Sequence, residues 1–132
     1  MGQAAGTGPA IAGRKFFLVL HVTGVALIIL LSLMPEAMLP IDGGSDKVKH
    51  LAAYGAVMLA GCGAYDRKRL WGVTALGLLL LGAVLEGLQG GFFGREASLG
   101  DMVANAAGIL LALTVGKFLE RRWPWRERGL SG

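Results

Sequence analysis

Four long apolar runs dominate the chain and are separated by shorter polar stretches. They cover residues 16–34, 48–65, 70–88 and 102–119, and each is 18 or 19 residues long. At a rise of 1.5 Å per residue, a helix of this length spans about 27–29 Å, close to the roughly 30 Å hydrocarbon core of a bilayer. The runs lack the alternating polarity of barrel strands, which need only about 10 residues. The pattern therefore predicts an all-α membrane protein, a bundle of four transmembrane helices.

The composition agrees with this environment. Of the 132 residues, 54% are hydrophobic, and the mean hydropathy is +0.57, which is too apolar for a soluble domain with one small core. Residues 1–13 are small and uncharged, and we expect a flexible tail there. Residues 14–120 are expected to form the transmembrane domain and residues 121–132 a basic tail. The first apolar run ends without a small-x-small cleavage site, which predicts a retained signal anchor.

The distribution of basic residues predicts the orientation of the chain. The net charge is +4, and ten of the thirteen lysines and arginines lie before the first run, between the second and third, or at the C-terminal end: Arg14, Lys15, Arg67, Lys68, Arg69, Lys117, Arg121, Arg122, Arg126 and Arg128. Basic residues beside short spans stay in the cytoplasm, so both termini and the middle loop are expected there. Trp71, Trp123 and Trp125 lie at the same boundary, which indole rings favour. Membrane lipids, rather than a nucleic acid, are therefore the expected partners.

A group of polar residues belongs to the opposite, outward end of the predicted bundle. They are Asp46, Lys47, His50, Tyr54, Glu86, Gln89, Arg95, Ser98, Asp101 and Asn105. Members of one run are mostly three or four residues apart, so they share a helix face. Because polar side chains are costly within a bilayer, we expect them to face the bundle interior and to form one site.

Residue chemistry suggests different roles within this group. Glu86 and His50 are the candidate catalytic acid and base. Lys47 and Arg95 could bind an anionic phosphate or carboxylate, and Asp101 with Asn105 could orient the reacting groups. The remaining members, Asp46, Tyr54, Gln89 and Ser98, are candidate binding residues.

Structural explanations remain open for several of these residues. Ser98 and Asp101 resemble a capping box, and Ser45 or Asp46 could cap the second helix. Lys47 could extend to lipid headgroups. His50 and Tyr54 could form a hydrogen-bonded core pair, and His21 is expected to be a packing histidine with a polar neighbour. Glu86 has no comparable explanation, because no helix terminus requires it.

Small residues predict where helices approach closely. Asn105, Gly108 and Ala112 form a stripe on the fourth run that is suited to close helix contact. The glycines at 72, 77, 82 and 87 recur every five residues, which predicts close packing on several sides of the third run.

No familiar metal or cofactor motif is present in the sequence. HExxH, GxSxG, a P-loop and Cys/His ligand spacings are all missing, so we expect neither a metal nor a cofactor. The single cysteine, Cys62, cannot form an internal disulfide and is expected to be buried among small residues.

Several segments together carry a resemblance to a known family. SLMP after the first run, SDKVKHLAAYG at the second, ExxQ ending the third and GREASLGDMVANAAGILLAL through the fourth resemble the VanZ-like family of small bacterial membrane proteins. The similarity covers roughly residues 25–115, and the ten polar residues named above match its motifs. The resemblance implies a bacterial inner-membrane protein of the cell envelope, with a possible link to resistance against the glycopeptide teicoplanin.

Two classes of function remain open. The protein could be an enzyme or binding protein for a lipid-linked or cell-wall headgroup, with a glycopeptide as another possible ligand. Alternatively, the polar group could be an interhelical hydrogen-bond lock in a non-catalytic accessory protein. Transport of a small amphiphile is disfavoured, because no Pro interrupts a span and no inverted repeat is evident.

Overall fold

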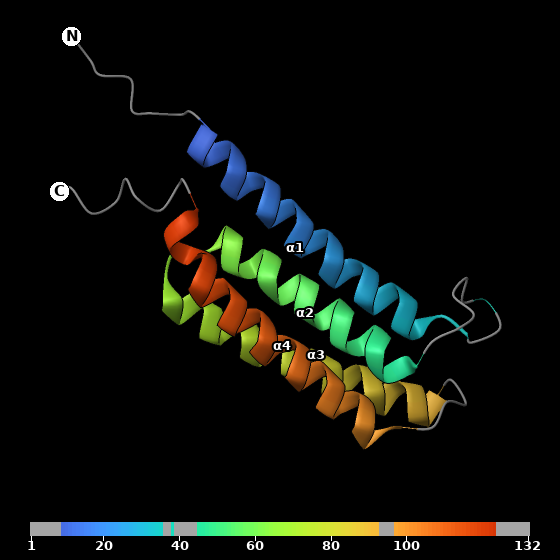
Figure 1. Ribbon diagram of the computed structural model, residues 1–132. Helices are drawn as coiled ribbons and strands as arrows, with labels where there is room; N and C mark the ends of the chain where they lie inside the picture. The colour runs from blue at the N-terminus through green and yellow to red at the C-terminus, as the bar shows by residue number, and fades with distance from the viewer. Residues whose placement is uncertain (1–8, 36–37, 39–44, 93–96, 124–132) are drawn as a thin grey trace, which may run out of the picture.

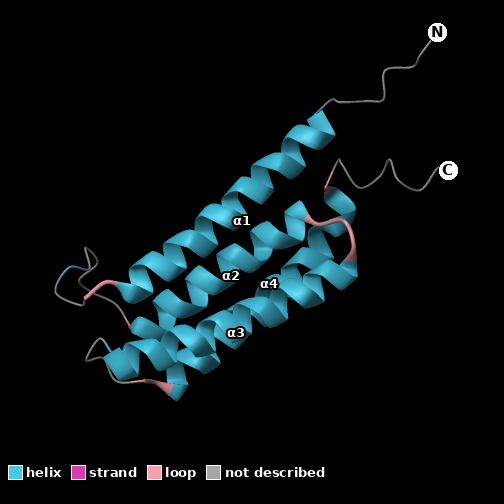
Figure 2. Cartoon of the chain, turned by 180° about the vertical axis from the view of Figure 1, so that it is seen from behind, coloured by secondary structure: helices cyan, strands magenta, loops and turns pink. Residues whose placement is uncertain are grey.

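Four helices lie side by side in one elongated bundle (Figures 1 and 2). This computed structural model describes residues 9–35, 38, 45–92 and 97–123. The elements are α1 (Pro9–Leu33), α2 (Asp46–Ala64), α3 (Lys68–Phe92) and α4 (Leu99–Leu119), followed by the short 3-10 helix η2 (Glu120–Arg122). The predicted all-α fold is confirmed, and each apolar run forms one helix.

The first helix begins earlier than the apolar pattern indicates. Its first residue is Pro9, so residues 9–13 are helical instead of belonging to the predicted tail. Proline is tolerated in the first helical turn, where its missing N–H would have no intrahelical partner anyway. A helix can therefore start at Pro9, several residues before the first apolar run begins at residue 16.

Ion pairs connect the helices at the end of the bundle where α1 begins. Arg14 Nη1 lies 2.7 Å from Asp66 Oδ2 in the short α2–α3 connection, and Lys68 Nζ lies 3.0 Å from Glu120 Oε1 of η2. The connection between α2 and α3 has only three residues, 65–67, which makes the two helices antiparallel neighbours. As a result, α1 begins and α4 ends at the same end of the bundle (Figure 1).

The core forms around α2, which packs against α4 and α1. Met58 and Cys62 of α2 are completely buried, and Ile109 of α4 is 1% exposed. α2 and α4 approach most closely at Gly55 and Gly108, because a Cβ added to Gly108 would lie 2.2 Å from the carbonyl oxygen of Leu51. The close contact predicted for the Gly108 stripe is confirmed, as is the burial of Cys62.

The regularly spaced glycines of α3, at residues 72, 77, 82 and 87, do not all mark close helix contacts. A Cβ at Gly72, Gly77 or Gly87 would meet no atom within 4 Å among the described residues. Only Gly82 of this set lies against a neighbouring helix. The prediction of close packing on several sides of α3 is therefore wrong, because the repeat winds around the helix while the neighbours cover one side.

Three helical segments are long and apolar enough to cross a membrane: Ile11–Leu33, Lys68–Phe92 and Leu99–Arg122. Their outward residues include large exposed hydrophobic side chains such as Val19, Leu80 and Phe118, which indicates a membrane protein. α2 does not meet this criterion. Polar residues occupy most of its first turn, and the apolar remainder, residues 51–64, has only fourteen residues and spans about 21 Å.

The tryptophans near the α1 start do not all belong to a surface belt. Trp71 is 4% exposed, and its Nε1 donates a hydrogen bond of 2.9 Å to the carbonyl oxygen of Tyr65 at the end of α2. Its ring packs edge-on against that of Trp123. Trp71 is thus a core residue that satisfies a helix-terminal carbonyl, whereas Trp125 lies outside the described residues.

Candidate functional site

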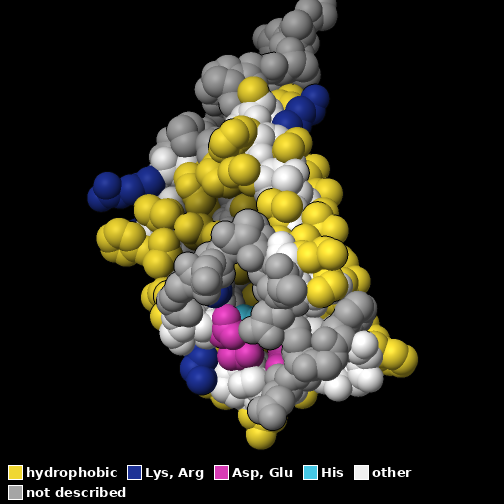
Figure 3. All heavy atoms as spheres, turned by 90° about the vertical axis from the view of Figure 1, so that its right-hand side faces the viewer, with side chains coloured by type: hydrophobic (Ala, Val, Ile, Leu, Met, Phe, Trp, Pro, Cys, Tyr) yellow, Lys and Arg dark blue, Asp and Glu magenta, His cyan; other side chains and the backbone are white. Residues whose placement is uncertain are grey.

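The polar site lies at the end of the bundle opposite to the one where α1 begins. Figure 3 views this end and shows acidic side chains and a histidine together, with hydrophobic side chains farther out along the flanks of the bundle. The residues come from the start of α2, the last turns of α3 and the start of α4. Antiparallel neighbours bring these three segments to one level, as the sequence predicts.

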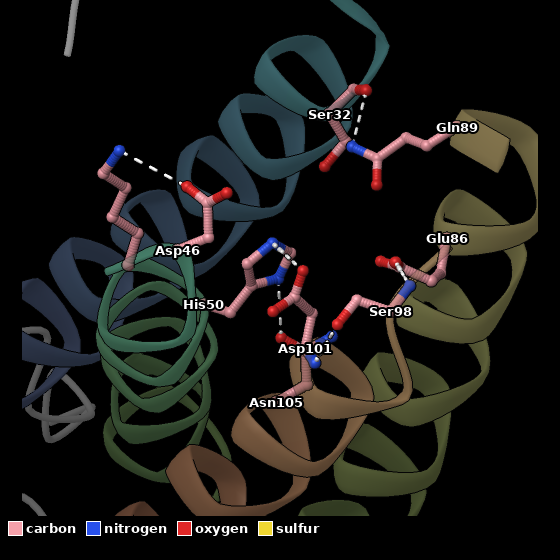
Figure 4. Close-up of polar contacts among 9 residues, drawn as sticks. Ser32, Asp46, His50, Glu86, Gln89, Ser98, Asp101 and Asn105 are labelled. Carbon is pink, nitrogen blue, oxygen red and sulfur yellow. Dashed lines mark hydrogen bonds and ion pairs between the residues drawn. The ribbon is translucent and has the colours of Figure 1, made fainter. Parts of the chain in front are cut away.

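Three ionisable side chains converge at the centre of this end. They are His50 of α2, Glu86 of α3 and Asp101 of α4, and one nitrogen or carboxylate oxygen of each lies within 4.8 Å of those of the other two (Figure 4). We call these three residues the polar cluster. Glu86 is 4% exposed, while the side chains of His50 and Asp101 are 19% and 15% exposed. The cluster is therefore enclosed on the Glu86 side and accessible from the end of the bundle.

Two neighbours hold the His50 ring. Its Nδ1 lies 3.0 Å from Oδ1 of Asn105, and the ring stacks on Tyr54 at a centroid distance of 6.4 Å and an interplanar angle of 12°. Because an amide oxygen only accepts, Nδ1 carries the proton and donates in this bond. Nε2 then faces Asp101 Oδ2 at 3.8 Å, which is too long for a hydrogen bond. The predicted His50–Tyr54 pair is thus a ring stack, and the hydrogen bond of His50 goes to Asn105.

Glu86 contributes to the start of α4. Ser98 is the N-cap residue of this helix, and its Oγ accepts a hydrogen bond of 3.3 Å from the backbone N–H of Asp101. In a complete capping box, the acid at the position of Asp101 would accept the N–H of Ser98. Here Glu86, which belongs to the neighbouring helix α3, accepts the hydrogen bond from the Ser98 N–H. The expectation that no helix terminus requires Glu86 is therefore wrong. The capping interpretation of Ser98 is confirmed, and the Asp101 carboxylate is left to face His50.

Gly82 makes room for this arrangement. A Cβ at residue 82 would lie 2.8 Å from the side-chain nitrogen of Asn105 and 3.2 Å from the Tyr54 hydroxyl. Asn105 and Tyr54 are themselves 2% and 3% exposed. The space beside α3 is thus filled by two polar groups, one of which holds His50.

Other predicted site residues lie apart from the cluster. Asp46 pairs with Lys49 at 3.4 Å on the surface, and Gln89 donates from Nε2 to the carbonyl oxygen of Ser32 at 2.8 Å. Ser32 lies in the last turn of α1, where carbonyl groups lack intrahelical partners, so Gln89 caps α1. Ser45 is the N-cap residue of α2, but its side chain makes no capping hydrogen bond, and that interpretation is wrong.

Lys47 and Arg95 are the two cations that the sequence predicts to bind an anion. Lys47 is exposed, and its Cε lies 2.6 Å from the position of a Cβ added to Gly100, so its chain runs over the first turn of α4. Arg95 lies outside the described residues. Among the described cations, Lys47 is thus placed at the rim of the helix that carries Asp101.

His21 occupies a separate position as a packing residue. It is 8% exposed, and its Nδ1 lies 2.9 Å from the carbonyl oxygen of Val57. The sequence prediction for this histidine is confirmed.

The charges of the cluster need compensation. Two ionised carboxylates with oxygens no more than 4.8 Å apart would repel each other by roughly 3 kcal/mol or more at an effective dielectric constant of about 20. The N–H of Ser98 offsets part of the charge of Glu86. Among the described residues, no hydrogen bond reaches the second oxygen of Glu86. The cluster can therefore accept a cation, a proton or a hydrogen-bond donor between its two acids.

Comparisons with known proteins give no relative: no protein-family model, curated protein or solved structure matches this chain.

Two contacts of the site are not evident from the sequence pattern. The bond between Glu86 and the Ser98 N–H joins different helices, and so does the bond between His50 and Asn105. One signal for the first is available in the sequence. The capping box has Asp in place of the usual Glu or Gln, whose longer side chain reaches back to the N-cap N–H.

Proposed function

We propose that this chain is a four-span protein of the bacterial inner membrane, related to the VanZ-like family, with both termini of the chain in the cytoplasm. Its polar cluster would face outward and bind the anionic headgroup of a lipid-linked cell-wall intermediate. The observation that carries this proposal is the convergence of His50, Glu86 and Asp101 from three helices at one end of an apolar bundle. Ionisable residues in such positions are costly and are commonly functional.

The surroundings of the cluster support binding of a headgroup. Lys47 extends over the start of α4, and the N-terminus of a helix itself favours anions. The large exposed hydrophobic side chains along α1, α3 and α4 would contact the acyl or prenyl chain of a membrane-bound ligand. His50 and Glu86 are the residues through which such a site could also donate or accept a proton.

A fourth span through α2 is compatible with its modest hydropathy. α2 packs between α1 and α4 and has eight buried residues, so much of its surface meets protein in place of lipid. The polar residues of its first turns would lie at the outer interface, where charges cost less than at the bilayer centre.

Cysteine labelling tests the proposed orientation. Cys62 is completely buried, so the native chain should give little background. We expect a membrane-impermeant maleimide to label Ala97→Cys in intact cells, and to label Arg67→Cys only after the membrane is opened. Both positions are exposed. Labelling of Arg67→Cys in intact cells, or protection of Ala97→Cys, would place the cluster on the cytoplasmic side and refute the proposed site.

Substitution of the two central residues tests the function. We expect Glu86→Gln and His50→Ala to abolish the envelope phenotype of the gene, measured as sensitivity to glycopeptide antibiotics and to osmotic stress, while the folded yield in detergent stays within about twofold. Asp46→Asn is the matched control, because this acid lies at the same end of the bundle and pairs only with Lys49 among the described residues. An unchanged phenotype in both variants would refute the proposal.

The alternative function, an interhelical hydrogen-bond lock, has its own support. Bonds from Glu86 to Ser98, from His50 to Asn105 and from Gln89 to Ser32 each join two helices. If the lock is the sole role of these residues, folded yield and phenotype must fall together in the same variants.

A further inference from the structure

We propose that the polar cluster is a binding site for one zinc ion, with His50 Nε2, Glu86 and Asp101 as the protein ligands. His50 and Glu86 are 36 positions apart and Glu86 and Asp101 are 15 apart, so the three residues do not form a local sequence motif. Their ligand atoms nevertheless lie within 4.8 Å of one another. Zn–N and Zn–O bonds of about 2.0–2.2 Å place tetrahedral ligand atoms about 3.3–3.6 Å apart, so each pair would have to close by at most about 1.5 Å when an ion binds.

The orientation of His50 is the first independent support. A histidine that binds a metal through one nitrogen usually donates its other N–H to a protein oxygen, which sets the tautomer and the ring plane. His50 meets this requirement, since Nδ1 is held by Asn105 at 3.0 Å and Nε2 faces Asp101. The ring is also stacked on Tyr54, and Asn105 is 2% exposed. The nitrogen that would bind the ion is therefore held toward the Asp101 carboxylate.

Glu86 is the second independent support. Its side chain comes from a residue that is 4% exposed, and one of its oxygens accepts the Ser98 N–H. The other oxygen has no hydrogen bond within the described part of the chain. Since the same carboxylate also has an oxygen within 4.8 Å of the ligand atoms of His50 and Asp101, this buried acid is well suited to a cation.

The ligand set favours zinc over magnesium and calcium. One imidazole and two carboxylates are a mixed nitrogen and oxygen set, whereas magnesium and calcium prefer oxygen ligands alone. Three protein ligands leave a coordination position open, as in zinc sites that also bind a ligand from solution. His50 and Asp101 are partly exposed, so this position would face the end of the bundle.

An ion in the cluster would also resolve an electrostatic difficulty of the proposed function. Two carboxylates repel an anionic headgroup, whereas a zinc ion between them would attract a phosphate oxygen, with Lys47 nearby at the start of α4. In this respect the inference rests on the proposed function. Binding of the ion itself does not, because it depends only on the three ligands and Asn105.

The test is a zinc titration of the purified full chain in detergent after removal of metal with a chelator. We expect one zinc per chain in competition with a chromophoric chelator, and a visible spectrum of low-symmetry coordination when Co²⁺ replaces zinc. Asp101→Asn and Glu86→Gln should each weaken zinc binding at least tenfold, while Asp46→Asn leaves it unchanged. Asn105→Ala, which removes only the positioning group, should weaken it by about 10- to 100-fold.

The possible results separate this inference from the proposed function. Absence of stoichiometric zinc binding, or equal affinity in Asp101→Asn and the wild type, would overturn the zinc site. Binding of a short polyprenyl phosphate is measured in parallel, with and without zinc. Zinc binding without phosphate binding would refute the headgroup function and leave the metal site intact. Phosphate binding by a chain that binds no stoichiometric zinc would refute the metal site and leave the headgroup function intact. A phosphate affinity that rises with zinc would support both.

Discussion

Replacing Gly108 by alanine is expected to prevent stable packing of α4 against α2. The added Cβ would lie 2.2 Å from the carbonyl oxygen of Leu51 and 3.1 Å from the backbone nitrogen of Gly55. Both are backbone atoms, so no side-chain rotation relieves the overlap, and the two helices must separate. Overpacking in a core commonly costs about 1–3 kcal/mol, and a backbone collision of this kind should exceed that range. We expect the folded yield in detergent to collapse and thermal unfolding of any remaining protein to occur well below that of the wild type.

Gly77→Ala is the matched control for this experiment. Gly77 also lies within a helix, but its added Cβ would meet no described atom within 4 Å. Alanine is favoured over glycine in a helix by up to about 1 kcal/mol, so the control should be neutral or slightly stabilising. If Gly108→Ala unfolds at the same temperature as Gly77→Ala, the close α2–α4 contact described above does not exist in the folded protein.

The helices could be predicted from the sequence because apolar runs of helical length leave few alternatives. The residues that meet at the end of the bundle opposite to the start of α1 could also be predicted. Neighbouring antiparallel helices place the polar start of one helix beside the polar end of the next. The sequence predicts His50, Glu86 and Asp101 at this end, and the structure brings them together. The pattern also indicated the small stripe at Gly108 correctly, because glycine beside other small residues on one face favours close approach.

The pairings inside the site could not be predicted in the same way. A helical repeat gives the face on which a residue lies, but the rotation of one helix against another determines which side chains touch. Gln89 shares a face with Glu86, yet it reaches α1 and caps Ser32 while Glu86 reaches α4. The prediction from the glycine repeat of α3 is wrong for a related reason. Close contact depends on where the neighbouring helices lie, and of the four glycines only Gly82 faces them.

Glu86 has two roles that its substitutions should separate. Its oxygen accepts the N–H of Ser98 and so completes the cap of α4, and its charge contributes to the polar cluster. Glu86→Ala removes the acceptor and leaves a partly buried N–H unsatisfied, which costs roughly 1–3 kcal/mol. Glu86→Gln keeps an oxygen at the same distance along the side chain and removes only the charge. We therefore expect the alanine variant to unfold several degrees lower in detergent, and the glutamine variant to remain close to the wild type.

Hydrogen exchange at the Ser98 amide gives the local measurement. Exchange should become at least tenfold faster in Glu86→Ala and should change little in Glu86→Gln, because a hydrogen-bonded amide exchanges only when the bond opens. Equal exchange in the two variants would contradict the cap across helices. This distinction matters for the function. If Glu86→Gln stays folded but loses zinc binding and the phenotype, the cause is the missing carboxylate charge and not loss of the fold.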